Sequence, residues 1–164
     1  MATRVYLGLG TNQGDKANNL TRAIEALSLA LGPSNAVSRF IETDPWGFES
    51  KNGFLNCVAA FETELSPLEL LDTTERIERE LGRTQKSAGG IYHDRIIDID
   101  ILLYGDKVVE NPRLTIPHPL MHKRTFVLEP LAEIAPEAIH PAIGNSIREL
   151  LEELRENEPN ITKG

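Results

Sequence analysis

The sequence predicts an α+β fold in which a split βαβ arrangement forms a largely antiparallel sheet with helices packed on it. Strands are expected where apolar residues alternate, and helices where they recur every three to four residues. The two kinds follow one another in the order strand, helix, strand, strand, helix, strand. Two helices would then cover one face of the sheet. The other face would be available for a site built from loops and strand residues.

The first half of the chain contains one expected helix and three expected strands. Val5, Leu7 and Leu9 alternate with Tyr6 and two glycines, which suits a strand that buries one face. Apolar residues from Leu20 onward then follow helical spacing, and a Gly-Pro pair at 32–33 ends that helix. The strands expected here cover residues 5–10, 36–43 and 54–64, with a loop over residues 44–53.

The second half starts with a strong helix signal. In Ser66-Pro67-Leu68-Glu69 the serine and glutamate form a capping box and proline takes the first helical position, so a helix should run from there to Gly82. A polar connection over residues 83–92 leads to the strongest strand, residues 96–104. The last third is rich in proline and turns. It ends in a second capping box, Ser146 to Glu149, which starts a final helix.

Length and charge limit the classes of protein. The 164 residues, 40% of them hydrophobic, suit a single domain spanning residues 1–164 with one core. A formal charge of -8 argues against nucleic acid as a partner but not against ATP, which a few cations in a cleft can bind. No segment suggests a signal peptide or a membrane span, and no obligate protein partner is evident. A single cysteine, Cys57, excludes an intrachain disulfide, so we expect a cytoplasmic protein.

Two aspartates in the strongest strand are the most informative residues. In Ile97-Asp98-Ile99-Asp100-Ile101 the isoleucines point one way, together with Leu103, and both carboxylates point the other, with their Cα atoms about 7 Å apart. Hard oxygen ligands of this kind suit Mg²⁺ bound beside substrate phosphates. The alternative is a polar strand face on which both aspartates simply meet water.

Several other residues could join such a site. Arg83, Arg95, Arg113 and Arg124 could bind a triphosphate if the fold brings them together, although each alone is typical of a surface. The glycines at 8, 10 and 14 match neither a dinucleotide-binding motif nor a P-loop. They could let the backbone approach a planar ligand or could serve only the turn.

With these residues laid out, the chain closely resembles the 6-hydroxymethyl-7,8-dihydropterin pyrophosphokinases, enzymes of folate biosynthesis. The resemblance covers nearly the whole chain and depends on the order and spacing of several motifs. These are Gly8-Leu9-Gly10-Thr11-Asn12, Thr43-Asp44-Pro45-Trp46-Gly47, Phe54-Leu55-Asn56, Gly82-Arg83, the run from Arg95 to Leu102, and Pro117-His118-Pro119 through Arg124, Phe126-Val127-Leu128 and Glu133-Ile134-Ala135-Pro136.

The resemblance implies a ferredoxin-like fold and transfer of the β,γ-diphosphoryl group of ATP to the hydroxymethyl group of the pterin, releasing AMP. It implies two Mg²⁺ ions held by Asp98 and Asp100, and closure of Arg83 and Arg95 over the triphosphate. The positions that match the nucleotide side of the family are Arg113, Thr115, His118 and Arg124.

On the pterin side, the resemblance implies that Asn56 hydrogen-bonds the amide edge of the heterocycle and that Phe54 and Phe126 sandwich the ring. Thr43 and Asp44 match backbone contributors. The chain departs from many members in having Tyr92-His93-Asp94 before Arg95.

Two other classes of function stay open on the residues alone. A regulatory module could bind a ligand on the same scaffold and consume no ATP. A metal-dependent phosphohydrolase could use the same carboxylates with water as the acceptor, and would release phosphate without the pterin.

Overall fold

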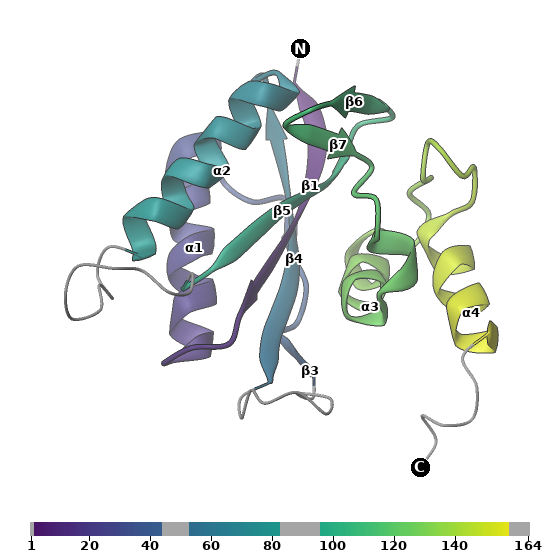
Figure 1. The fold of residues 1–164 in the computed structure, drawn as a ribbon, viewed down its shortest axis with the longest axis horizontal. Coiled ribbons are helices and arrows are strands. Elements are labelled where there is room, and N and C mark those ends of the chain that lie inside the picture. Colours follow the sequence, from purple (N-terminus) through teal and green to yellow (C-terminus); the bar gives the residue numbers. More distant parts are fainter. Residues whose placement is uncertain (1, 44–52, 83–95, 158–164) are drawn as a thin grey trace.

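A five-stranded antiparallel sheet organises the protein, whose computed structural model describes residues 2–43, 53–82 and 96–157. Strand β1 (Thr3–Thr11) lies between β4 (Phe54–Thr63) and β5 (Asp98–Tyr104) (Figure 1). The short strands β2 (Ala36–Val37) and β3 (Ile41–Thr43) both pair with the other edge of β4. This order is that of a split βαβ fold and confirms the predicted class.

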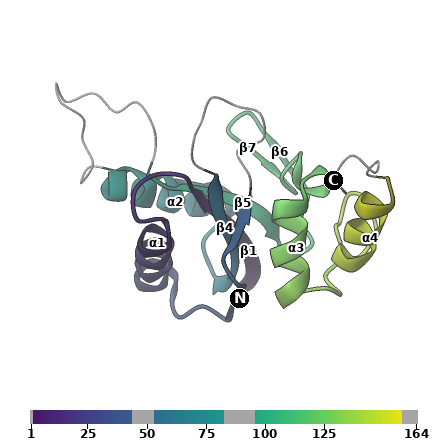
Figure 2. The same cartoon turned by 90° about the horizontal axis from the view of Figure 1, so that it is seen from below.

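Helices α1 (Lys16–Leu31) and α2 (Pro67–Gly82) pack on one face of the sheet, as predicted (Figure 2). Each starts where the sequence indicates. Asp15 caps α1 by accepting from the Asn18 amide, and Ser66 and Glu69 exchange the two hydrogen bonds of a capping box at α2. The core between these helices and the sheet includes Leu7, Leu27, Phe61, Ile77 and Ile101.

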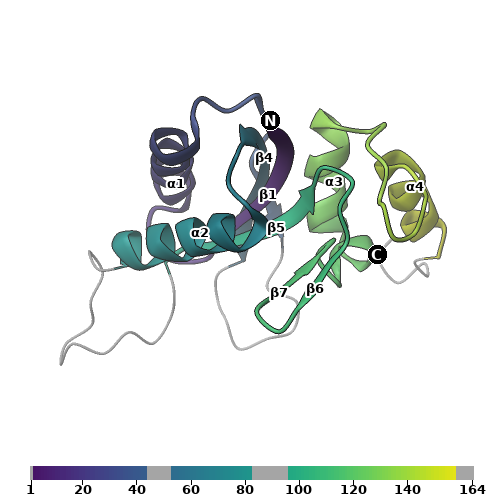
Figure 3. The same ribbon diagram turned by 90° about the horizontal axis from the view of Figure 1, so that it is seen from above.

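The opposite face of the sheet carries a second helical layer. Helix α3 (Thr125–Ile134) packs on it, and α4 (Ile147–Asn157), which starts at the predicted capping box of Ser146 and Glu149, packs against α3 (Figure 2). A hairpin of β6 (Val109–Asn111) and β7 (Leu114–Ile116) leads into this layer through the short helix η3 (Met121–Lys123) (Figure 3). The face predicted to be available for a site is therefore only partly open, because α3 covers some of it and forms one wall beside the site.

Two strands differ from their predicted form. The strand expected over residues 36–43 is interrupted, because the Ser38 hydroxyl accepts from the Val58 amide and donates to the Arg39 carbonyl, which takes the place of regular pairing. In β5 the register with β1 shifts between Tyr6 and Leu7. Because of this bulge, the Leu103 side chain points toward α3 and packs in a second cluster of buried residues that includes Leu128. The prediction that Leu103 lies on the same face as the isoleucines was therefore wrong.

Among the described residues, none of the helices is both long and apolar enough to cross a membrane.

Candidate active site

A groove of about 570 Å³ opens where β1, β4 and β5 meet the start of α3. Seven of the predicted site residues line it, and they come from segments that are far apart in the sequence. They are Thr43, Phe54, Asn56, Asp98, Asp100, Arg124 and Phe126. The fold therefore brings predicted metal, nucleotide and pterin positions to one place.

Asp98 and Asp100 lie on the groove face of β5, while Ile99 and Ile101 between and after them are buried against α1 and α2. Asp98 is half-buried, and the side chain of Asp100 is 51% exposed. The predicted separation of carboxylates from isoleucines is thus confirmed. Their position beside Gly8 and Gly10 of β1 follows from the register of the two strands.

Glu78 of α2 fixes the backbone between the two aspartates. Its Oε2 accepts a 2.7 Å hydrogen bond from the amide of Ile99, on β5, the edge strand of the sheet. An edge amide has no neighbouring strand to accept its hydrogen bond, so a side chain from the helix above takes that role. Sequence reasoning missed this residue, because no local pattern links position 78 to position 99.

The two aspartates have the right chemistry for Mg²⁺. No group of three or more His, Cys, Asp or Glu side chains gathers into a metal cage within the ranges that the structure describes. Mg²⁺ commonly binds one or two carboxylates and completes its octahedron with water and substrate phosphates. A half-open pair of carboxylates on the floor of a groove therefore fits this ion better than Zn²⁺, which prefers a closed set of nitrogen and sulfur ligands.

His118, in the segment after β7, lies beside Asp100. Its Nδ1 accepts from the Leu120 amide at 3.2 Å, so the proton of the neutral ring is on Nε2, which lies 4.0 Å from Asp100 Oδ2. Burial lowers the pKa of His118, Asp100 opposes that shift and Arg124 adds to it. A neutral imidazole therefore presents an N–H donor beside Asp100, although His118 itself is not among the residues that line the groove.

Asn56 forms the polar part of the other end of the groove. It is only 7% exposed, and its Nδ2 donates to the Thr43 hydroxyl over a long 3.5 Å. Gly10 of β1 lies directly across from it, and a Cβ at this position would stand 2.8 Å from Asn56 Oδ1. Gly10 therefore provides space for Asn56, a role that depends on strand register and could not be read from the turn motif.

Phe54 and Phe126 supply the aromatic surface. Phe54 is 40% exposed at the start of β4, and Phe126 is half-buried at the start of α3. The Arg124 guanidinium lies 5.6 Å from the centre of the Phe126 ring. Cys57, on the groove lining, is buried, and burial raises the pKa of its thiol to about 12, so it packs as an unreactive hydrophobe.

Arg113 and Thr115 lie outside the groove lining, on the hairpin. The Arg113 guanidinium binds Asp72 at 2.8 Å and Glu75 at 3.3 Å on α2, and the hydrogen bond that it donates to Asp72 is the main cause that raises the pKa of Arg113. Thr115 is exposed opposite Glu110. The predicted residues Asp44, Arg83 and Arg95, and the expected loop over 44–53 apart from Gly53, lie outside the described residues.

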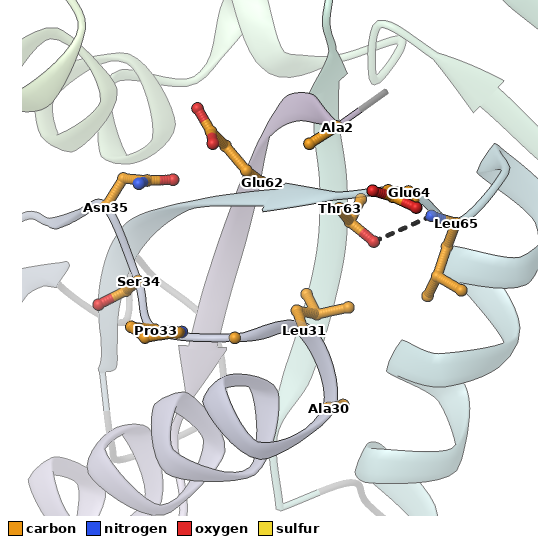
Figure 4. A pocket seen from close by; sticks show the side chains of 11 residues that line it. Ala2, Ala30, Leu31, Pro33, Ser34, Asn35, Glu62, Thr63, Glu64 and Leu65 are labelled. Carbon is orange, nitrogen blue, oxygen red and sulfur yellow. Dashed lines mark hydrogen bonds between the residues drawn. The ribbon is translucent and has the colours of Figure 1, made fainter.

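A second hollow, of about 640 Å³, lies at the other end of β4 (Figure 4). It is lined by the end of α1, residues 32–35 and the carboxylates of Glu62 and Glu64. No lysine or arginine of the described chain lines it, and none of the predicted site residues is there. Without a cation to attract phosphate, it is a poorer candidate for a nucleotide site than the groove.

Comparison with known proteins relates this geometry to one family. Residues 6–136 match the family described as 7,8-dihydro-6-hydroxymethylpterin-pyrophosphokinase (HPPK). A protein of Porphyromonas gingivalis named 2-amino-4-hydroxy-6-hydroxymethyldihydropteridine pyrophosphokinase is 54% identical over 138 residues, covering 84% of this chain and 93% of its own. The Aquifex aeolicus protein of the same name is 44% identical over 149 residues, covering 91% and 90%.

Solved structures support the fold. The crystal structure of Plasmodium falciparum HPPK-DHPS with pteroate has a TM-score of 0.77 at 18% identity and matches all of this chain. A structure of HPPK-DHPS in complex with substrates has a TM-score of 0.72 at 16% identity over 95% of this chain. In both cases the match spans 44% of the solved chain, so it concerns only part of those longer proteins.

Proposed function

This chain belongs to the 7,8-dihydro-6-hydroxymethylpterin-pyrophosphokinase family, and from that premise we propose that the groove is where ATP and the hydroxymethyl pterin react. The enzyme transfers the β,γ-diphosphoryl group of ATP to 6-hydroxymethyl-7,8-dihydropterin in folate biosynthesis, giving AMP and the pterin diphosphate. The observation that carries the assignment of the site is that Asp98 and Asp100 share one groove with Asn56. We expect the reaction to take place in the cytoplasm, with no obligate protein partner.

The transfer is an in-line substitution at the β-phosphorus. The pterin hydroxyl oxygen forms the new P–O bond and loses its proton, while the bond from that phosphorus to the oxygen bridging the α- and β-phosphates breaks and AMP leaves. The groove suits this reaction because its carboxylate end lies on β5 and its amide end on β4, the two strands that flank β1. Both substrates can therefore be held at once, and orientation supplies much of the rate enhancement.

Asp98 and Asp100 would hold Mg²⁺, and we propose two ions. When bound, these ions neutralise charge on the triphosphate and orient its β-phosphorus. The aspartates provide fixed oxygen ligands because Glu78 and the pairing with β1 set the backbone that bears them. The N–H of His118 on Nε2 lies beside Asp100, where it can donate to Asp100 or to a phosphate oxygen.

Cationic side chains would balance the remaining charge of the triphosphate. Arg124 lies on the groove and is available to the nucleotide. Arg113 and Thr115 are proposed to contact the nucleotide from the hairpin, and Arg113 would exchange its carboxylate partners on α2 for phosphate. Arg83 and Arg95 are proposed to stabilise charge that develops on the phosphates during transfer.

The other end of the groove would select the pterin. Asn56 offers both a donor and an acceptor to the amide edge of the heterocycle, and Thr43 and Asp44 are proposed to contribute backbone groups. Phe54 and Phe126 supply surfaces on which a planar ring can stack. An analogue without the amide edge would leave a buried polar side chain unpaired, so it should bind poorly.

One assay tests the proposal. The protein is mixed with ATP, Mg²⁺ and 6-hydroxymethyl-7,8-dihydropterin, and the products are separated by chromatography. AMP together with a diphosphorylated pterin supports the proposed function. Phosphate released without the pterin would instead support a phosphohydrolase, and an unchanged ATP pool would support a binding module.

A further inference from the structure

Side chains at the junction of β1 and α1 form hydrogen bonds with the segments on both sides of the groove. At the Thr11 end, the buried hydroxyl of Thr11 donates a 2.6 Å hydrogen bond to the carbonyl of Ile96, 85 positions later in the chain. At the α1 end, Lys16 Nζ donates a 3.0 Å hydrogen bond to the carbonyl of Gly53. These two carbonyls lie on opposite sides of β1, one before β5 and one before β4.

The hydrogen bond of Thr11 extends the contact between β1 and β5 beyond the last residues whose backbones pair. That register ends at Gly10 and Asp98, and the bond from Thr11 then holds Ile96, two residues before the aspartate. Ile96 is 5% exposed, so its carbonyl cannot rely on bulk water. The bond therefore determines where the aspartate strand begins.

Asn19 supports this bond from α1. Its Nδ2 donates to Thr11 Oγ1 at 3.2 Å and to the Gln13 carbonyl at 2.8 Å, which uses both hydrogens of the amide. The Thr11 hydroxyl thus accepts a hydrogen bond from Asn19 while it donates one to Ile96. These two bonds fix the orientation of the hydroxyl. A fully satisfied chain of hydrogen bonds specifies one geometry.

The position of Lys16 in the helix is electrostatically unfavourable. Lys16 is the first residue of α1, and apart from the N-cap residue Asp15 the start of that helix contains no acidic residue. A cation at a helix N-terminus is unfavourable, because it faces the positive end of the helix dipole. The half-buried side chain instead reaches Gly53, the residue before Phe54.

We propose that the junction of β1 and α1, residues 11–19, is a positioning element for both ends of the groove. Lys16 holds the pterin end by fixing the backbone that leads into Phe54. Thr11, with Asn19, holds the aspartate end by fixing the backbone that leads into Asp98. The inference rests on the proposed function for the identity of the two ligands.

The test compares two substitutions that should affect different ligands. Lys16→Met should raise the KM for the pterin about 3- to 10-fold, the usual net size for loss of one hydrogen bond, and leave Mn²⁺ binding unchanged. Thr11→Val should weaken Mn²⁺ binding in the presence of a non-hydrolysable ATP analogue, measured by electron paramagnetic resonance, by about 3- to 10-fold and leave the pterin KM unchanged. Lys16→Arg and Thr11→Ser, which keep the donors, should restore wild-type values.

Matched controls separate positioning from general stability. Lys107→Met removes the same charge beside Tyr104, and Thr63→Val removes a buried hydroxyl that accepts from Leu65 at the far end of β4. Both should leave the two ligand constants unchanged, although Thr63→Val lowers the melting temperature. Where Thr11→Val does not fold, Asn19→Ala takes its place, because it removes only the supporting donor.

The results distinguish failure of the positioning role from failure of the proposed function. If the wild-type chain forms no AMP, the proposed function fails. If the wild-type chain is active but each substitution changes both ligands equally, or neither ligand, the positioning role is overturned and the proposed function stands.

Discussion

Gly10 and Asn56 face each other across β1 and β4, so closely that a methyl group on residue 10 would stand 2.8 Å from the Asn56 side-chain oxygen. Real Cβ atoms do not approach an oxygen this closely, so one of the two side chains would have to move. Because Asn56 is buried at the end of the groove that we propose binds the pterin, any such movement would change the polar surface offered to the heterocycle.

Gly10→Ala should therefore weaken pterin binding by about tenfold and lower the unfolding free energy by about 1–3 kcal/mol, as overpacking does. Calorimetric titration and urea denaturation measure the two effects. Gly8→Ala is the matched comparison, because the nearest atoms to its Cβ would be those of the flexible Leu102 side chain, at 3.3 Å and beyond. Equal losses of pterin affinity in both variants would contradict the role given to Gly10.

Asp98→Asn and Asp100→Asn should each lower turnover at least about 100-fold, a loss typical when a group that stabilises transition-state charge is removed. Removing one of two like charges should leave the melting temperature unchanged or slightly higher. Asp106→Asn removes an exposed carboxylate from the turn after β5 and should keep full activity. Near-normal Mg²⁺-dependent turnover in either of the first two variants would exclude the metal role.

Glu78→Leu should lower the unfolding free energy by about 1–3 kcal/mol, because the Ile99 amide then lacks its acceptor. Glu78→Gln keeps an oxygen of similar reach and should recover most of that stability. Amide hydrogen exchange at Ile99 reports directly on the contact. Unchanged exchange in the leucine variant would mean that the side chain does not cap the edge of β5.

A histidine outside the groove should make the protein sensitive to acid. His140 Nδ1 accepts from the amides of Ala142 and Ile143, so its ring must be neutral to form this turn. Burial lowers the pKa of His140 below its usual 6.5, and His122, whose ring lies 6.1 Å away, lowers it further. The folded state thus binds this proton less readily than the unfolded state does.

The stability that this histidine contributes is present above pH 6.5 and is lost as the pH falls below that value toward the pKa in the folded state. Urea denaturation at pH 7.5 and pH 5.5 measures the loss. His140→Asn supplies an acceptor that does not titrate in this range and should reduce the difference between the two conditions. His122→Asn should retain most of it, because burial is the larger cause.

Local signals account for the elements that could be predicted from sequence. Capping boxes located the starts of α2 and α4, and alternation located β4 and β5. Helix α3 was missed because it contains Pro130 and its N-cap residue, Arg124, makes no side-chain capping bond. The hairpin strands have only three residues each, too few to show a period.

In the candidate site too, only the residues that have a local sequence signal could be predicted. The aspartates could be predicted because their alternation with isoleucines is local. The contributions of Gly10, Thr11 and Glu78 depend on which strands and helices become neighbours. They appear only when residues far apart in the chain are seen together.

The bulge in β5 gives that strand two independent halves. Before it, side chains alternate between the groove and the layer of α1 and α2; after it, Leu103 joins Leu102 in the cluster against α3. Residues beyond the bulge can therefore drift during evolution without rotating the aspartates. Deleting Ile101 would instead shift Asp98 and Asp100 by one position and turn the acidic pair inward, into hydrocarbon.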